Sequence, residues 1–437
     1  MKKWNEISAG SFMKGLFAFF TAAFLLTAVL MPDRGTMFSG LVQIVTQSSK
    51  VTTNYFAVGG YAAAFLNAGL VCLAGTLLFV LTGATPNAAS NLAFLLTAGF
   101  CFWGINILNI WPSILGVLLY CLVKRAKVNT QVNAMLFSTG IAPLITDLMI
   151  RYPNAEVVGF TWQGVLLALG VGLVIGFFLP GGLVNAPKVH KGYSLYSAAV
   201  PIGLTAFFLR AVLYQVLNGK LPEASTDLTV ASWPVANGFC IAVFALCVVA
   251  AFAMGCSLRD YGRLLGDSGY GVDFTQKYGN AAALMNLGIF GLFILLYYNL
   301  IGAQFNAVTL GCIFCMLSCC FSGSHPGNVW PIMVGYVAAS FLGKWLCVGD
   351  YTQAINAQPI VIGLCFANGL SPVSGRYGWY WGVAAGAMHF CLVTSVPLLH
   401  GGFCLYNGGF TAAFICLLLI PFLEHFFRVR ESQPVQK

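Results

Sequence analysis

Charged side chains inside apolar runs are the first candidates for chemistry in this sequence, because a bilayer does not solvate them. Arg210 stands in the middle of such a run, where a charge without a partner or a wet cavity costs roughly 2.5–3.5 kcal/mol or more. Asp147 and Arg376 each follow a proline by four residues, after Pro143 and Pro372. Asp147 and Arg376 carry opposite charges at the same position of two similar segments. They could neutralise each other beside a substrate path, or both could stand at helix ends that face water.

A second group of candidates consists of polar residues that occur once in each half of the chain. The pairs are Asn67/Asn286, Asn87/Asn306, Asn109/Asn328, His190/His400 and Tyr196/Tyr406, with Asn106 matched by His325. An asparagine inside a span can hydrogen-bond a polar solute, or it can join two helices at roughly 0.6–2 kcal/mol each. The histidines could sense protons or merely cap helices. As a set beside interrupted helices, these residues favour a polar pathway.

An internal duplication relates these pairs. Residues 60–116 align without a gap with residues 279–335, at an offset of 219, and 20 of the 57 positions are identical. Apolar composition alone would make roughly a tenth of them identical, so the match indicates a repeat. Further along, the offset changes to 229 and then to 210 as loops change length. The chain therefore divides into two homologous tandem repeats, 1–218 and 219–437.

Composition places both repeats in a membrane. Hydrophobic residues make up 59% of the chain and charged residues only 8%, with a mean hydropathy of +0.84. Soluble domains carry about a quarter charged residues. The apolar runs have the length of membrane-spanning helices, and each helix satisfies its own backbone groups in lipid. We therefore predict an all-α, polytopic membrane protein in contact with the lipid bilayer.

The expected membrane segments follow the same order in both repeats. In repeat 1 they are about 12–31, 55–82, 87–103, 112–125, 130–150, 159–179 and 192–217, with an amphipathic stretch at 37–49. In repeat 2 they are about 234–255, 279–301, 306–322, 331–346, 354–372, 377–398 and 408–427, with a polar connector at 257–277. Each repeat thus has about six or seven segments, and the segments at 130–150 and 354–372 are broken by a glycine and a proline.

The segments 104–112 and 323–331 are the expected helix breaks. The helices beside the first break have about 17 and 14 residues and reach only about 25 and 21 Å, less than the roughly 30 Å hydrocarbon core. A residue before proline avoids the helical region, so Trp111 should end the break, with Pro112 starting a helix and Asn109 near its N-cap. Such a break lines a polar cavity, or it is a tight surface turn with tryptophan among the headgroups.

Orientation depends on whether the broken segments cross the bilayer. If they cross, each repeat has seven crossings and the two repeats are inverted; if they are re-entrant, the repeats are parallel. The distribution of Lys and Arg does not separate these arrangements. We favour the inverted one by analogy with duplicated transporters. Basic residues up to Lys14 precede the first apolar run, so we expect a retained first span, a cytoplasmic N-terminus and a multi-pass protein of the cell (cytoplasmic) membrane.

Signatures of enzymes and cofactors are missing from the sequence. It contains no HExxH, Walker loop or dinucleotide fingerprint, so we expect neither enzymatic activity nor a cofactor. Cys312 and Cys315 have CxxC spacing, but no histidine or charged partner lies in their apolar run, and packing is the better explanation. The net charge of +9 comes from Lys and Arg at span ends, so nucleic acid is not an expected partner.

Three motifs resemble a known family of bacterial membrane proteins, catalogued as domain of unknown function 1576. They are Leu66-Asn67-Ala68-Gly69-Leu70, Asn109-Ile110-Trp111-Pro112 followed by Gly116, and His190-Lys191-Gly192-Tyr193-Ser194-Leu195-Tyr196. The resemblance spans most of the chain. It implies no substrate and no activity.

The sequence as a whole predicts a permease or channel for a small polar solute, with its path at the interface of the two repeats. Residues expected near that path are Asn67, Asn286, Asn106, His325, Asn109, Asn328, Asp147, Arg376, Arg210, His190 and His400. The alternative is a non-transporting membrane protein, either an intramembrane enzyme or an accessory subunit that uses the duplicated core as a scaffold. Association into a homo-oligomer stays open.

Overall fold

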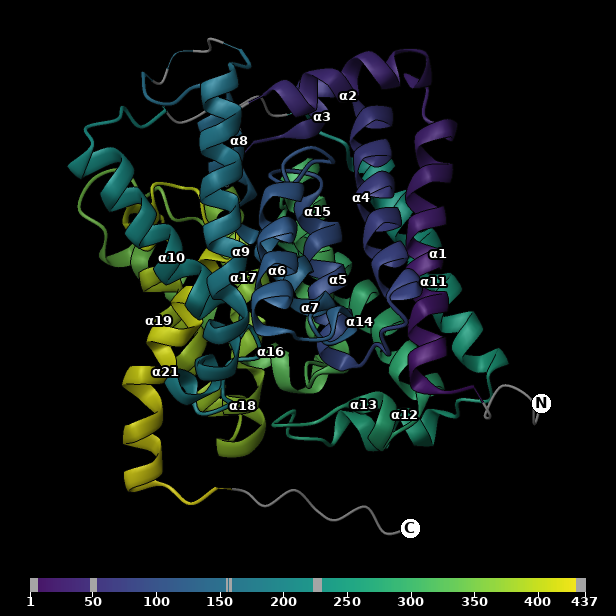
Figure 1. The fold of residues 1–437 in the computed structure, drawn as a ribbon. Helices are drawn as coiled ribbons and strands as arrows, with labels where there is room; N and C mark the ends of the chain where they lie inside the picture. Colours follow the sequence, from purple (N-terminus) through teal and green to yellow (C-terminus); the bar gives the residue numbers. More distant parts are fainter. Residues whose placement is uncertain (1–6, 48–52, 155, 157–158, 223–229, 430–437) are drawn as a thin grey trace.

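The computed structural model describes residues 7–47, 53–154, 156, 159–222 and 230–429, and this part of the chain is helical with no strand. Its helices pack as one bundle, with most of them running between the upper and lower faces of Figure 1. Nine helical segments of the described part are long and apolar enough to cross a membrane, and α5, α6 and α15 are shorter apolar helices. The predicted all-α, polytopic class is confirmed.

Repeat 1 follows the predicted order of segments. Its helices are α1 (Ala9–Leu30), α2 (Met37–Thr46), α3 (Tyr55–Gly59), α4 (Tyr61–Leu81), α5 (Ala88–Phe100), α6 (Trp111–Lys124), α7 (Val132–Ser138), α8 (Ala142–Ile150), α9 (Trp162–His190) and α10 (Ala199–Ala211). A 3₁₀ turn, Thr139–Ile141, joins α7 to α8, and together they form one broken span, Val132–Ile150. The amphipathic helix α2 lies across the top of the bundle in Figure 1.

Repeat 2 has the same plan. Its helices are α11 (Trp233–Ala253), α12 (Leu258–Leu265), α13 (Phe274–Lys277), α14 (Asn280–Ile301), α15 (Ala307–Leu317), α16 (Pro326–Leu346), α17 (Gln358–Ala367), α18 (Ser371–Tyr377), α19 (Trp379–Val393), α20 (Pro397–His400) and α21 (Asn407–Phe426). The 3₁₀ turn Asn368–Leu370 joins α17 to α18 and reproduces the break of repeat 1. Helices α12 and α13 form the polar connector, which lies along the lower face in Figure 1.

Equivalent helices of the two repeats run antiparallel where they meet. Along α5 and α15, Asn91 contacts Ser318, Leu96 contacts Cys315 and Gly99 contacts Gly311, so residue numbers rise in one helix as they fall in the other. Helices α5 and α15 are counterparts at the offset of 219. Two counterparts that cross antiparallel are related by a two-fold axis perpendicular to them, so the repeats are inverted, as predicted.

Three boundaries differ from the sequence prediction. Helix α9 does not end at Pro180 but continues through Pro180 and Pro187 to His190. A proline interrupts one backbone hydrogen bond, and membrane helices tolerate that loss when neighbouring groups compensate. A residue before proline usually avoids the helical region, but Trp111, which precedes Pro112, is the first residue of α6.

The third difference is the start of α16, which begins at Pro326 and contains Pro331. His325 is its N-cap, in extended conformation, so the second break is shorter than the first. The proline at the first position of the helix costs nothing, because its missing N–H would have no partner within the helix. Repeat 2 therefore reaches helical geometry four positions earlier, relative to the motif, than repeat 1.

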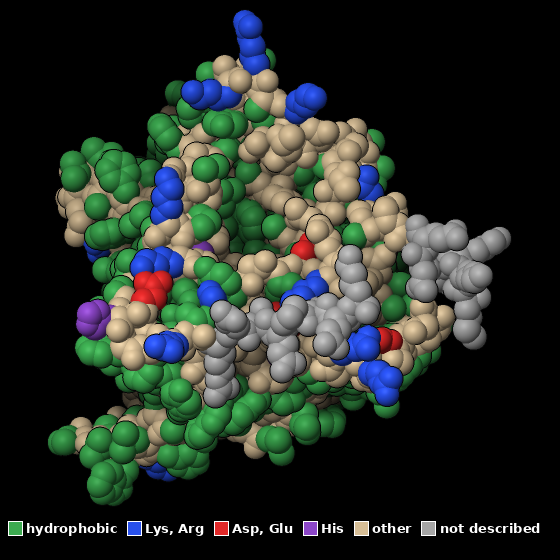
Figure 2. Space-filling view, turned by 90° about the horizontal axis from the view of Figure 1, so that it is seen from below, with side chains coloured by type: hydrophobic (Ala, Val, Ile, Leu, Met, Phe, Trp, Pro, Cys, Tyr) green, Lys and Arg blue, Asp and Glu red, His purple; other side chains and the backbone are tan. Residues whose placement is uncertain are grey.

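Basic side chains gather on the lower face of the molecule, which Figure 2 shows directly. The connector contributes Arg259 and Arg263 on α12 and Lys277 on α13. Lys191 and Arg376 belong to the same face, because the Tyr270 hydroxyl donates to the Lys191 carbonyl at 2.8 Å and the Arg376 guanidinium lies 4.2 Å from the Tyr270 ring centre.

Candidate functional site

Asn67 holds the break of repeat 1 from the neighbouring helix α4. Its side-chain nitrogen donates to the carbonyls of Cys101 at 2.7 Å and Ile105 at 2.9 Å. Its side-chain oxygen accepts the N–H of Ile107 at 3.1 Å. The side chain is fully buried and all three contacts are made to the backbone of the break. Asn67 therefore satisfies polar groups that the interrupted helix leaves open.

Asn106 and Asn109 complete the first break with contacts of their own. The Asn106 side-chain oxygen accepts the N–H groups of Leu108 and Asn109, at 3.0 and 2.9 Å. The Asn109 oxygen accepts the Asn106 N–H at 2.8 Å, and its nitrogen donates to Gly104 O and Thr146 Oγ1, both at 3.0 Å. Asn109 thus closes the turn and ties it to α8, which differs from the predicted N-cap role.

In repeat 2, Asn286 makes the contacts of Asn67 with one exception. Asn286 on α14 donates to the carbonyls of Cys320 at 2.8 Å and Ser324 at 2.9 Å, at the offset of 219 from the Asn67 contacts. The Asn286 side-chain oxygen has no hydrogen-bond partner in the part of the chain that the structure describes. The counterpart of Ile107 is Pro326, which has no N–H to donate.

Asn328 and His325 close the second break. Asn328 donates to Gly323 O at 2.8 Å and accepts the His325 N–H at 3.0 Å, as Asn109 does in repeat 1. The His325 ring replaces the amide of Asn106, and its Nε2 lies 2.9 Å from the carbonyl of Asp267 in the connector. Because a carbonyl only accepts, this nitrogen carries the proton. His325 therefore fastens the second break to the connector.

Asp267 organises the connector around this contact. Its carboxylate accepts from Lys277 Nζ and from the Tyr278 hydroxyl, both at 2.7 Å, and from the N–H of Gly269 at 2.8 Å. Burial alone would raise the pKa of Asp267, but the hydrogen bonds from Lys277, Gly269 and Tyr278 and the charge of Lys277 outweigh it and lower the pKa. The carboxylate stays ionised and keeps the connector closed over the break.

His190 and His400 form tight turns rather than open sites. His190 Nδ1 lies 3.2 Å from the N–H of Gly192, and its Nε2 lies 3.0 Å from Ser197 Oγ. His400 Nδ1 accepts the N–H of Cys404 at 3.2 Å, and its Nε2 lies 3.1 Å from Asn407 Oδ1. Both rings are almost completely buried. Each histidine fixes the loop that leads to a buried tyrosine.

The loop that follows each histidine contacts the other repeat. The Leu195 N–H donates to Gly369 O at 3.0 Å, and the Leu405 N–H donates to Gly140 O at 2.9 Å. The rings of Tyr196 and Tyr406 pack directly on the two glycines. A first side-chain carbon on Gly369 would lie 2.5 Å from Tyr196, and one on Gly140 would lie 2.0 Å from Tyr406. Each repeat thus places a tyrosine at the helix break of the other.

The exchange is not symmetrical in its hydrogen bonds. The Tyr196 hydroxyl donates to Asn368 Oδ1 at 2.7 Å and lies 2.9 Å from the carbonyl of Cys315. The Tyr406 hydroxyl is buried and has no partner among the described residues. The counterpart of Asn368 is Thr139, whose shorter side chain donates to Leu136 O instead.

The charged candidates lie apart from one another, so the first of the two alternatives, an ion pair of Asp147 with Arg376, is wrong. Asp147 is buried on α8 and accepts from the Tyr214 hydroxyl. Arg376 on α18 donates to the Tyr193 hydroxyl at 3.2 Å. Helices α8 and α18 lie at opposite ends of the molecule in Figure 1, because inversion carries equivalent positions to opposite faces. Arg210 lies in the last turn of α10, and its Nε has no partner among the described residues.

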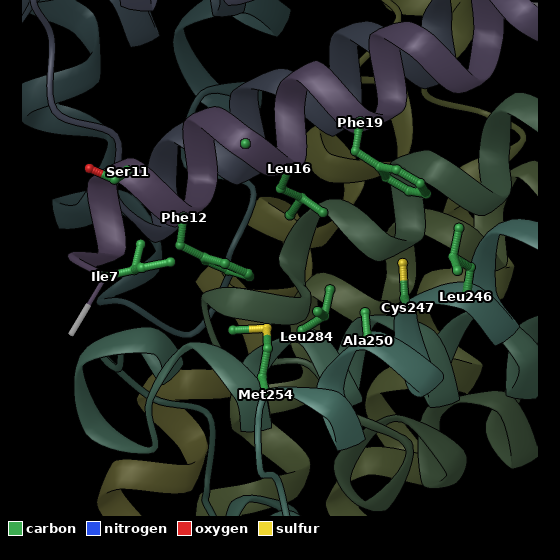
Figure 3. Close-up of a pocket in the computed structure, with 11 residues that line it drawn as sticks. Ile7, Ser11, Phe12, Leu16, Phe19, Leu246, Cys247, Ala250, Met254 and Leu284 are labelled. Carbon is green, nitrogen blue, oxygen red and sulfur yellow. The ribbon is translucent and has the colours of Figure 1, made fainter. Parts of the chain in front are cut away.

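Two adjoining cavities open near the start of α1. One, of about 500 Å³, is lined almost entirely by apolar side chains of α1, α11 and α14, which point towards one another in Figure 3. The other, of about 440 Å³, has a polar lining that includes Asp260, Thr275 and Asn280. Ile7 and Met254 line both cavities. The described residues contain no group of three or more His, Cys, Asp or Glu side chains that could hold a metal.

A family model described as "Protein of unknown function (DUF1576)" matches residues 33–215 and 255–425, one region in each repeat. The chain belongs to the DUF1576 family. No curated protein and no solved structure matches it. The resemblance seen in the three sequence motifs is thereby confirmed over most of the chain.

Sequence reasoning missed two features of this DUF1576 protein. Asn91 was not a candidate because it has no counterpart, its equivalent being Leu310. The second feature is Pro326, which stands where repeat 1 has Ile107 and removes the N–H that would satisfy the Asn286 amide. Both differences are visible when the repeats are aligned. The signal in the sequence is a polar residue, or a proline, at a position where the other repeat has an apolar residue.

Proposed function

We propose that the protein is a permease or channel for a small polar solute, with its path at the interface of the two repeats, and that it is not an enzyme. The observation that carries the proposal is the exchange of Tyr196 and Tyr406 between the repeats. Each tyrosine rests on a glycine at a break in a buried helix, close to the two-fold axis. Duplicated transporters bind their substrates where discontinuous helices of inverted repeats meet, so the arrangement supports this function.

The 3₁₀ turns in the two broken spans would also allow movement. The turns Thr139–Ile141 and Asn368–Leu370 divide their spans into two short helices, and glycine lets a ring pack against the backbone there. Rocking of one repeat against the other would shift each tyrosine relative to the opposite break. Access would then alternate between the two faces without unfolding either repeat.

Flux measurements on the purified protein test the proposal. In proteoliposomes, we expect a solute from a panel of ions, amides, polyols and amino acids to move faster than in empty liposomes. Gly369→Ala should lower that flux, because the added carbon meets the Tyr196 ring. Gly170→Ala is the matched control, since nothing lies within 4 Å of the added carbon. Folded protein that moves no solute, or equal flux for both variants, would contradict the proposal.

A different observation favours a non-transporting scaffold as the second candidate. The side chains of Asn67, Asn109, Asn328, His190 and His400 make their hydrogen bonds within the chain, which is what a static core requires. A scaffold needs these contacts for stability and not for flux. Folded, reconstituted protein that is inactive with the whole panel would favour this candidate.

The membrane and the orientation of the chain form part of the proposal. We place the protein in the cell membrane with its N-terminus in the cytoplasm. The start of α1, the connector and the end of α21 share the lower side of Figure 1, and the basic residues of the connector lie there. Cytoplasmic faces of membrane proteins carry an excess of Lys and Arg, which supports this orientation.

A further inference from the structure

An unsatisfied acceptor stands at the second helix break. The Asn286 side chain is fully buried, and both hydrogen bonds of its nitrogen, to Cys320 O and Ser324 O, fix which end of the amide is the oxygen. In repeat 1 the same oxygen receives the N–H of Ile107. Pro326 removes that donor from repeat 2. The Asn286 oxygen is therefore left open by one substitution in an otherwise duplicated turn.

A second open acceptor approaches the same turn from α5. Asn91 is fully buried, and its nitrogen donates to Ser318 O at 3.1 Å. Its oxygen has no partner among the residues that the structure describes. The Asn91 nitrogen lies 3.9 Å from the sulfur of Cys320, whose carbonyl receives the hydrogen bond of Asn286. The two amides thus flank one residue from two helices that belong to different repeats.

The polar cavity beside α14 reaches along that helix as far as Ala282. It is lined by Thr275, Tyr278 and residues 279–282 of the connector and of α14. Ala282 and Asn286 are four residues apart, so they lie on one face of α14, with Asn286 one turn deeper. The Tyr261 hydroxyl of α12 is also buried and has no partner among the described residues.

The chemistry of the open groups selects the ligand. Both amide oxygens only accept hydrogen bonds, and a buried acceptor without a donor loses the free energy that water would have supplied. A ligand that offers N–H or O–H groups restores that free energy. A carboxylate or phosphate offers further acceptors and gains nothing from either amide.

We propose that Asn286 and Asn91 bind a small solute through its N–H or O–H donors, such as an amide, a polyol or ammonium, which enters from the connector side. The proposal names the substrate class of the transport function proposed above and in that sense rests on it. The site joins the two repeats, because Asn91 comes from repeat 1 and Asn286 from repeat 2.

Pro326→Ile is the decisive variant, because it copies the residue of repeat 1 and offers its backbone N–H to Asn286. A first-turn N–H has no partner within the helix, so it is free to donate. We expect the unliganded variant to melt at the same or a higher temperature than the parent. We also expect urea, glycerol or ammonium to raise the melting temperature of the parent but not of Pro326→Ile. Acetate at equal ionic strength should shift neither.

Two further variants keep the test independent of folding. Pro331→Ala removes another proline of α16, one that packs against Gly382 of α19, and should leave the ligand-induced shift unchanged. Asn91→Leu copies Leu310 of the other repeat and should weaken binding about tenfold, the loss expected for one hydrogen bond of a buried group. Equal shifts in the parent and Pro326→Ile, or no shift of the parent with any of the three donors, would overturn the proposal and leave an ordered water as the sole occupant.

Flux separates this proposal from the proposed function. Transport that persists unchanged in Pro326→Ile, with any solute of the panel, would overturn the binding site and leave the permease intact. If a ligand stabilises the parent but not Pro326→Ile, and the protein moves no solute, the binding site is upheld and transport is rejected.

Discussion

Cys315 Sγ lies 3.9 Å from the carbonyl oxygen of Leu96, and these two residues occupy equivalent positions of the two repeats (96 + 219 = 315). A residue that touches its own counterpart lies on the axis that relates the repeats. The axis therefore passes between α5 and α15, which cross there with small residues, Gly99 and Gly311, in close backbone contact. Side chains as small as these let two helices approach closely inside a membrane.

Cross-linking across the axis tests the inverted arrangement. In a background that keeps Cys315 as its sole cysteine, we expect Leu96→Cys to be bridged to Cys315 by dibromobimane, which fluoresces when it joins two nearby thiols. Protease cleavage in the connector should then leave the two fragments linked. Leu95→Cys, on a different side of α5, is the matched control. Bridging of the control alone would show that the helices cross in another register.

The duplication made much of the fold predictable from sequence. The alignment of residues 60–116 with 279–335 identified Asn67 and Asn286 as counterparts, and their side-chain nitrogens make equivalent contacts. The broken spans around Gly140 and Gly369 were predictable too, since a glycine and a proline interrupt each apolar run. These features depend on local backbone chemistry, which sequence records directly.

Features that depend on partners from other helices were not predictable. Helix α9 passes Pro180 because it packs along α6, where Gly172 and Gly176 let the two backbones touch. The candidates Asp147 and Arg376 matched in sequence, but inversion separates matched positions that lie far from the axis. Distance from the axis is a property of the assembled bundle, so sequence alone could not decide whether the charges meet.

The two breaks should differ in stability when their closing asparagines are removed. Asn109→Leu loses three hydrogen bonds, including one to Thr146, and Asn328→Leu loses two. Because the remaining partners are buried, we expect costs of roughly 2–4 and 1–3 kcal/mol in unfolding free energy. Thermal unfolding in detergent measures the difference. An equal or larger loss for Asn328→Leu would contradict this account of the first break.

Labelling from outside intact cells tests the orientation of the chain. In a cysteine-free background, a cysteine at Arg125 should resist a membrane-impermeant maleimide, whereas one at Lys344 should react. The two positions end the counterpart helices α6 and α16, and inversion puts them on opposite sides of the bilayer. Permeabilised cells provide the control, in which both should react. Equal labelling of the two positions in intact cells would rule out inversion.

At low pH the connector should lose stability, because the Asp267 carboxylate becomes protonated. Its pKa in the folded protein is lowered from the ordinary value of 3.8, against the effect of burial, by hydrogen bonds from Lys277, Gly269 and Tyr278. A lowered folded pKa means that the carboxylate stabilises the fold fully above the ordinary value. That contribution is lost as the pH falls below about 4 and through the folded pKa.

Asp267→Asn isolates this contribution. At pH 7 the variant should lose roughly 1–3 kcal/mol, because the Lys277 ammonium keeps no charged partner there. Between pH 5 and pH 3 the parent should lose stability towards that of the variant, whose own stability should change less. Asp350→Asn is the control: that carboxylate is exposed beyond the end of α16, so its loss should matter little. A difference between parent and Asp267→Asn that stays constant down to pH 3 would show that the ionised carboxylate does not hold the connector on the break.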